Sequence, residues 1–154
     1  MLYRQLAFAA ATSLLLAACH EQAPQNAEAP ATTATPTPAG PQCYAYISGK
    51  DTVRLTLATT QPTVTGQLSY RYFEKDRNEG TINGIMHGDS LLASYVFQSE
   101  GTTSVRQVAF LRRDIGFIEG FGPMVEGKGK MVFEQPNALQ YDAKYTLLPV
   151  TCPK

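Results

Sequence analysis

Residues 51–73 read DTVRLTLATTQPTVTGQLSYRYF, which is two alternating runs separated by Gln61-Pro62. In each run apolar and polar side chains follow one another with a period of two. Such alternation is typical of a β-strand with one buried face. The apolar face comprises Val53, Leu55 and Leu57 in the first run and Val64, Leu68, Tyr70 and Tyr72 in the second. We therefore expect two strands, at 51–60 and 63–73, joined by a short turn.

The same pattern continues outward to both ends of a region of residues 42–154. Residues 139–147 alternate again, with Leu139, Tyr141, Ala143, Tyr145 and Leu147 predicted on one face. Shorter candidate strands lie at 43–48, 80–86, 90–98, 104–112, 116–121 and 128–133. Turn-forming pairs such as Gly49-Lys50 and Glu100-Gly101 separate them, and no amphipathic helix is long enough to cover a sheet.

About eight or nine strands in local hairpins predict an all-β domain with the order of a meander. We expect a small antiparallel up-and-down β-barrel that resembles the lipocalin type, with a β-sandwich as the alternative. Gly66, Gly84 and Gly120 lie inside predicted strands, at positions where a small barrel would bend.

The N-terminus contains Arg4, an apolar run at 6–16, and then Leu16-Ala17-Ala18-Cys19. This order resembles the signal peptide and lipobox of bacterial lipoproteins. The resemblance implies cleavage after residue 18 and attachment of acyl chains, such as palmitate, to Cys19. The alternatives are an ordinary signal peptide or a transmembrane helix, but the run is shorter than the roughly 20 residues that a membrane span needs.

Further resemblance to lipoproteins places the protein in the cell envelope of a Gram-negative bacterium. His20, rather than Asp, follows the lipidated cysteine, which favours the outer membrane, with the domain on the periplasmic or surface side. Residues 19–41 are rich in Ala, Pro and Thr and contain no aromatic or large aliphatic residue, so we expect a lipidated, disordered tether.

With Cys19 assigned to lipid, Cys43 and Cys152 are the only cysteines left to pair. An oxidising envelope compartment favours a disulfide between them. A metal site or redox pair is the alternative, but neither cysteine is part of a CxxC motif or has a histidine near it in sequence. A Cys43–Cys152 bond requires the two ends of the domain to lie side by side, and this favours closure of the sheet.

The composition gives little support for catalysis. Without Arg4, Glu21 and Glu28, the 13 basic and 13 acidic residues of the chain become 12 and 11, so no basic surface for nucleic acid is expected. His87 is the domain's one histidine, and we interpret it as an exposed turn residue. We expect no cofactor and no metal.

A carboxylate-dependent hydrolase is the remaining enzyme hypothesis. It requires acidic residues to meet at one end of the barrel, and the candidates are Glu100, Asp114, Glu119 and Glu126.

The middle of the domain is unusual because apolar residues occupy both faces of three predicted strands. Leu92 and Val96 oppose the face that contains Leu91 and Tyr95, and Ala109 and Ile118 likewise join apolar neighbours. One face fills the barrel, and the other needs cover from the chain after Phe121, a second subunit or a partner. The candidate binding surface comprises Tyr72, Tyr95, Phe97, Glu100, Phe110, Phe117, Glu119 and Phe121.

The stretches 70–77, 80–84 and 99–101 resemble small bacterial lipoproteins that have no assigned activity. Lysozyme-inhibitor lipoproteins are a poorer match, because the Ser-Gly pair occurs only at Ser48-Gly49. Copper-responsive envelope lipoproteins carry a CxxC near the domain start, and Cys43 has no such companion. We therefore expect a membrane-anchored, non-catalytic module that binds a small apolar ligand or an envelope protein, with the hydrolase as the alternative and the oligomeric state left open.

Overall fold

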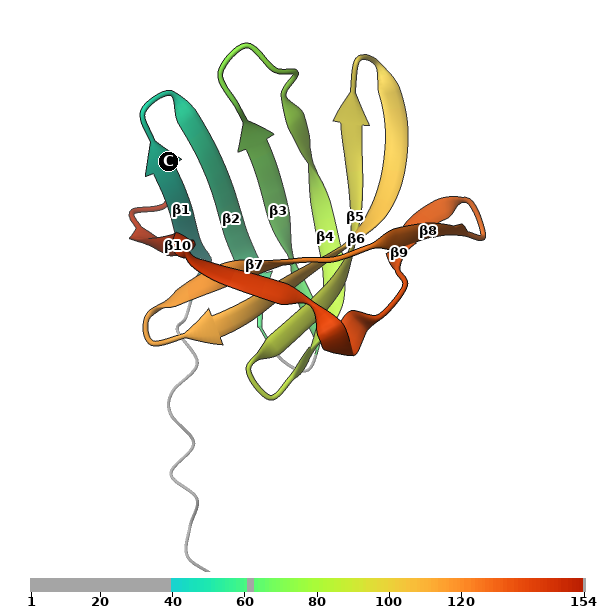
Figure 1. Cartoon of the computed structure of the whole chain (residues 1–154). Coiled ribbons are helices and arrows are strands. Elements are labelled where there is room, and N and C mark those ends of the chain that lie inside the picture. Colours follow the sequence, from blue (N-terminus) through green and yellow to red (C-terminus); the bar gives the residue numbers. More distant parts are fainter. Residues whose placement is uncertain (1–39, 61–62, 154) are drawn as a thin grey trace, which may run out of the picture. The chain divides into compact units, whose positions relative to one another are not determined.

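The computed structural model describes residues 40–60 and 63–153 (Figure 1). The predicted signal peptide, the lipobox and almost all of the tether lie outside the described residues. The strands are β1 (Gln42–Ser48), β2 (Asp51–Thr59), β3 (Thr63–Arg71), β4 (Asn78–His87), β5 (Ser90–Ser99), β6 (Thr102–Arg113), β7 (Gly116–Phe121), β8 (Met124–Gly127), β9 (Lys130–Phe133) and β10 (Gln140–Val150), and a 3₁₀ helix, η1, spans Pro136–Ala138.

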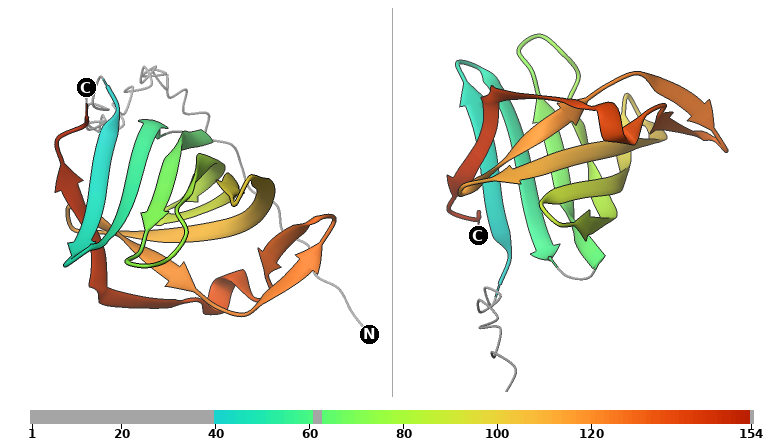
Figure 2. Two further views of the ribbon diagram at one scale, coloured as in Figure 1. Left: turned by 90° about the horizontal axis from the view of Figure 1, so that it is seen from above. Right: turned by 60° about the horizontal axis from the view of Figure 1, so that its bottom comes forward.

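Eight of these strands form a closed antiparallel barrel. Each of β1 to β7 pairs with its neighbour in sequence, β7 then pairs with β10, and β10 returns to β1. The views in Figures 1 and 2 show β6, β7 and β10 crossing one side of the wall that β1 to β5 make. The expected up-and-down barrel is confirmed, and the β-sandwich alternative is wrong because β5–β6 and β10–β1 pairing leaves no open edge among the eight strands.

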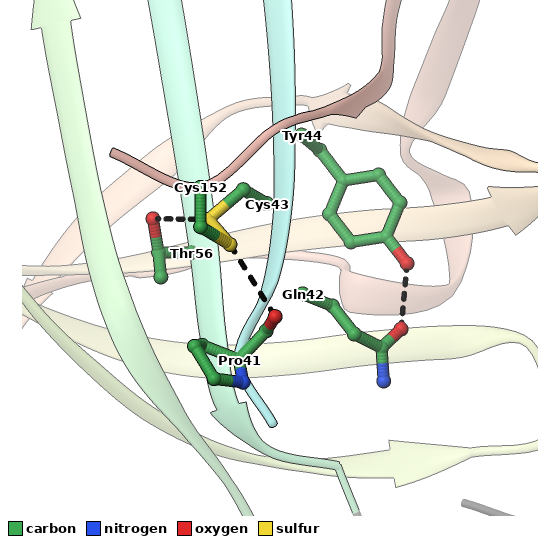
Figure 3. Close-up of a disulfide and its surroundings, with 6 residues drawn as sticks. All are labelled: Pro41, Gln42, Cys43, Tyr44, Thr56 and Cys152. Atoms are coloured by element: carbon green, nitrogen blue, oxygen red, sulfur yellow. Dashed lines mark hydrogen bonds between the residues drawn. A yellow bond between two sulfur atoms is a disulfide. The ribbon is translucent and has the colours of Figure 1, made fainter. Parts of the chain in front are cut away.

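The Cys43–Cys152 disulfide joins the two ends of the barrel sequence (Figure 3). The two Cα atoms are 5.2 Å apart across 109 residues of sequence. Cys43 pairs with Val150 in the β1–β10 ladder, so the bond covalently reinforces the seam that closes the barrel. Thr56 Oγ1 and the carbonyl oxygen of Pro41 lie 3.5 and 3.3 Å from the two sulfur atoms. The predicted disulfide is thus present.

The inward faces of the strands make one apolar core. Its largest fully buried side chains include Leu55, Leu68, Ile82, Leu91 and Phe110, with Tyr95 among them. Gly66 of β3 also faces inward. The carbonyl oxygen of Thr56 in β2 occupies the space that a Cβ at this position would need, so a glycine allows the two strands to come close together there. Every residue of this core cluster lies between the two disulfide cysteines in sequence, so the barrel contains its own apolar core.

The last strand departs from the predicted alternation. Tyr141 pairs with Gly120, yet Thr146 pairs with Ile118, so β10 has a bulge between these positions. The bulge reverses the faces: Leu147 points into the core, while Tyr141 lies over Gly120 on the outside. The prediction of one shared face for 139–147 is therefore wrong. Hydrogen bonds from Lys144 N to Asp142 Oδ1 and from Thr146 Oγ1 to Ala143 O stabilise the bulge.

The chain after Phe121 covers part of the outer apolar surface. The hairpin β8–β9, of which the sequence predicted one strand at 128–133, touches the barrel through the Arg106–Met131 bridge. Phe133 N donates to Gln107 Oε1, and η1 and its flanks lie beside Leu92 and Ala109. Ala109 and Ile118 are buried, whereas Val96 is exposed. Local packing therefore accounts for much of the second apolar face. Within 40–60 and 63–153, no helix is long and apolar enough to cross a membrane.

Candidate functional site: a cavity at one barrel end

A cavity of about 350 Å³ lies near the end of the barrel that carries the β1–β2, β3–β4 and β5–β6 turns. This end is uppermost in Figure 1, and the left view of Figure 2 looks onto it. The volume falls within the roughly 300–1,000 Å³ of small-molecule sites. The cavity lies where β1, β2, β7 and β10 meet the chain that follows β3, and it is lined by Tyr46, Asp51, Val53, Tyr72, Glu119, Phe121, Tyr145 and Leu147.

Glu119 is the one buried charged or polar residue of the described chain, with 6% of its surface exposed. It lies on the inward face of β7, opposite Phe110 of β6. The Tyr70 hydroxyl donates a hydrogen bond to Glu119 Oε1 at 2.5 Å. Burial raises the pKa of Glu119 to about 7, although the Tyr70 hydrogen bond and the charge of Arg106 act in the opposite direction. Near neutral pH the carboxyl can therefore act as a proton donor or as an anion.

Arg106 lies on the inward face of β6, with Val108 and Phe110, and its charge acts on this carboxyl. Its guanidinium is 5.1 Å from the ring centroid of Tyr70 and 5.7 Å from those of Tyr95 and Phe97. Tyr95 stacks on Phe97 with ring centroids 4.7 Å apart, so two of the three rings beside this guanidinium pack against each other. The ion pairs of the described residues do not include Arg106 with Glu119, and Arg106 Nε is buried without a hydrogen-bond partner.

Aromatic rings form the rim of the cavity. Tyr46 and Tyr145 meet edge to face, with centroids 5.5 Å apart. The ring of Tyr72 lies beside that of Tyr70, with centroids 6.2 Å apart. Burial raises the pKa of the Tyr72 hydroxyl, and it raises the pKa of the Tyr70 hydroxyl strongly. Asp51 is held by a 2.7 Å hydrogen bond from Phe73 N. The rim thus combines apolar ring faces with one fixed carboxylate.

The predicted binding residues fall into three groups. Tyr95, Phe110 and Phe117 are buried in the core, and Phe97 packs against it. Glu119, Tyr72 and Phe121 line the cavity. Glu100 lies exposed in the β5–β6 turn.

The four acidic residues considered for hydrolysis do not meet. Glu100 and Asp114 follow β5 and β6 respectively, so the length of the twelve-residue β6 separates them. Glu126 is exposed on β8, and Glu119 is buried inside the barrel. Among the described residues, no group of three or more His, Cys, Asp or Glu side chains is placed to hold a metal ion, and His87 is exposed at the end of β4.

Sequence reasoning did not propose five residues of the cavity lining, nor the two residues, Tyr70 and Arg106, that act on Glu119. The five lining residues are Tyr46, Asp51, Val53, Tyr145 and Leu147. Arg106 had a usable signal, because it shares the face of Val108 and Phe110 in a strand and is a charge at a predicted inward position. The apolar residues on the opposite face of the same strand obscured that signal. Asp51 gave none, since an acidic residue at the start of a strand is ordinary.

Comparison of the chain with models of protein families, with curated proteins and with solved structures finds no match.

Proposed function

We propose that this protein is a lipid-anchored lipoprotein of the bacterial envelope whose barrel binds a small ligand in the cavity around Glu119. The proposal for the anchor rests on the lipobox, Leu16-Ala17-Ala18-Cys19, and on the disulfide, which suits an oxidising compartment. With acyl chains on Cys19, the outer membrane would hold the protein, and residues 19–41 would connect the lipid to the barrel.

The observation that carries the binding proposal is a ligand-sized cavity that contains a buried carboxyl. Burial of an ionisable group with a perturbed pKa costs stability, and such groups concentrate at functional sites. The cavity wall is mainly apolar and contains two carboxyl groups, Asp51 and Glu119. A mostly apolar wall with a few convergent polar groups is the usual composition of a small-molecule site.

The test is native mass spectrometry of the barrel, residues 42–154, exported to the periplasm with a cleavable leader and purified without detergent. We expect a bound molecule that denaturation releases and that a cavity variant, Val53→Phe, excludes. A barrel that carries no bound molecule and gains none from an envelope extract would contradict the proposal. Separately, labelled palmitate should enter the full-length protein and not its Cys19→Ala variant, and the absence of labelling would remove the anchor.

A small hydrolase remains the second candidate, because Asp51 and Glu119 line the same cavity. The raised pKa of Glu119 would suit a general acid near neutral pH. A screen of ester and glycoside substrates with the Glu119→Gln and Asp51→Asn variants tests it. Turnover that both variants abolish would establish the enzyme, and turnover that neither affects would eliminate it.

A further inference from the structure

The cavity has a specific charge character. Of its eight lining residues in the described chain, four are aromatic and two are acidic, and none is Lys, Arg or His. Aromatic ring faces carry partial negative charge and attract cations, most strongly where water is excluded. The rings and the carboxylates of this cavity therefore favour the same sign of ligand charge.

Ring faces near this end of the barrel already hold cations of the chain itself. Arg106 lies over Tyr70, Tyr95 and Phe97. Lys144 Nζ lies 4.6 Å from the ring centroid of Tyr145 at the rim. Lys144 is exposed on the β10 bulge, so its flexible side chain can move away and make the Tyr145 ring accessible to a ligand. Tyr46 stands edge to face with Tyr145, and the two rings together form an aromatic corner.

Glu119 has an oxygen available for a ligand. Its Oε1 accepts the Tyr70 hydroxyl, whereas the side-chain hydrogen bonds of the described residues include none to Oε2. Oε2 is also absent from the fully enclosed unpartnered atoms, which are Asn78 Oδ1 and Arg106 Nε. Since Glu119 lines the cavity, we conclude that Oε2 faces the cavity space.

The charged groups of the cavity and its rim leave room for one more positive charge. The cavity lining contains two carboxyl groups, Asp51 and Glu119. Arg106 contributes one positive charge that acts on Glu119, and the charge of Lys144 at the rim is offset by its ion pair with Asp142. One monovalent cation would neutralise this set. An anion would instead meet two carboxylates, because Arg106 is not among the residues that line the cavity.

We propose that the ligand is a monovalent organic ammonium ion, a protonated or quaternary amine, bound with its charged head between Glu119, Tyr46 and Tyr145. Val53 and Leu147 contact its apolar part. This inference rests on the proposed binding function and names the chemical class of the ligand.

The experiment is an NMR titration of the isotope-labelled barrel, residues 42–154, at pH 8 with three probes of similar shape. Choline is the cation, 3,3-dimethylbutan-1-ol is its neutral isostere, and 3,3-dimethylbutanoate is the anion. We expect choline to shift the resonances of Tyr46, Tyr145 and Glu119 and to bind about tenfold more tightly than the neutral isostere. The anion should bind least.

Two variants and a matched control locate the effect. Glu119→Gln keeps the side-chain shape and should remove most of the preference for choline over the neutral isostere. Tyr145→Leu keeps an apolar side chain at a half-exposed position and should weaken choline more than the isostere. Glu126→Gln removes a carboxylate from the exposed β8 strand and should change neither affinity.

The outcomes separate this inference from the proposed function. Equal affinity for the neutral isostere, or tighter binding of the anion, would overturn the ammonium assignment, while a bound molecule in native mass spectrometry would still support a binding barrel. No cavity shift with choline up to tens of millimolar would also overturn the assignment. Only an empty barrel in the mass-spectrometry test would remove the binding function itself.

Discussion

Replacement of Glu119 by Gln should stabilise the barrel at alkaline pH. Glu119 is buried, and its charge is only partly compensated by Tyr70 and Arg106. Gln has nearly the same shape, and its carbonyl oxygen can still accept the Tyr70 hydroxyl. The substitution therefore removes a buried charge while it preserves the packing and the hydrogen bond.

The magnitude follows from proton linkage. The pKa of Glu119 is about 7 in the folded barrel, against an ordinary value of 4.5. Between these values the folded protein retains a proton that the unfolded chain has lost, so the free energy of unfolding falls as the pH rises. Each pKa unit corresponds to about 1.4 kcal/mol, which gives a loss of roughly 3 kcal/mol above pH 7. Below pH 4.5 this loss is absent.

Urea unfolding followed by circular dichroism at pH 4.5 and pH 8, with the disulfide intact, measures this effect. We expect Glu119→Gln to unfold with a free energy close to wild type at pH 4.5 and about 3 kcal/mol higher at pH 8. The exposed Glu126→Gln variant should match wild type at both values. A Glu119→Gln variant that is less stable than wild type at pH 8 would refute the reasoning, because ionised Glu119 would then be a net stabilising partner of Arg106.

Three further predictions concern the frame around the cavity. The double variant Cys43→Ala, Cys152→Ala should lose about 4–5 kcal/mol of unfolding free energy in urea titrations, since the bond joins two positions that are 109 apart in sequence; an unchanged midpoint would contradict a structural role. Arg106→Met should raise the pKa of Glu119 above its wild-type value in ¹³C NMR, because a neighbouring positive charge is lost; a lower pKa would show that Arg106 does not act on the carboxyl. Gly66→Ala should cost about 1–3 kcal/mol in chemical denaturation, because its Cβ meets a backbone carbonyl of the adjacent strand; a neutral result would mean that the strand moves freely there.

The barrel was predictable because its signals are local. Alternation in residues 51–73 requires only that one face be buried, and Val53, Leu55 and Leu68 are indeed in the core. The predicted disulfide then required the two ends of the domain to meet.

The β10 bulge was not predictable, because the sequence of residues 139–147 fits an uninterrupted strand. Only the pairing of β10 with the shorter β7 requires the extra residues in β10.

The site was predictable only in part, because its members come from strands far apart in sequence. Tyr70 and Glu119 are 49 positions apart, and no local pattern relates them. Glu119 appeared among the candidates as one acidic residue among several, and Arg106 did not appear. Their shared location depends on the register of β3, β6 and β7 around the closed barrel, which alternation alone does not determine.

The most direct measurement of the central claim is the titration of the Glu119 side-chain carboxyl carbon by ¹³C NMR, with and without saturating choline. The groups that act on it, Tyr70 and Arg106, remain unchanged in both titrations. We predict a midpoint near 7 in the free barrel and a lower midpoint with choline, because a bound cation favours the ionised carboxyl. A midpoint near 4.5 that choline does not move would contradict both the buried carboxyl and the cation site.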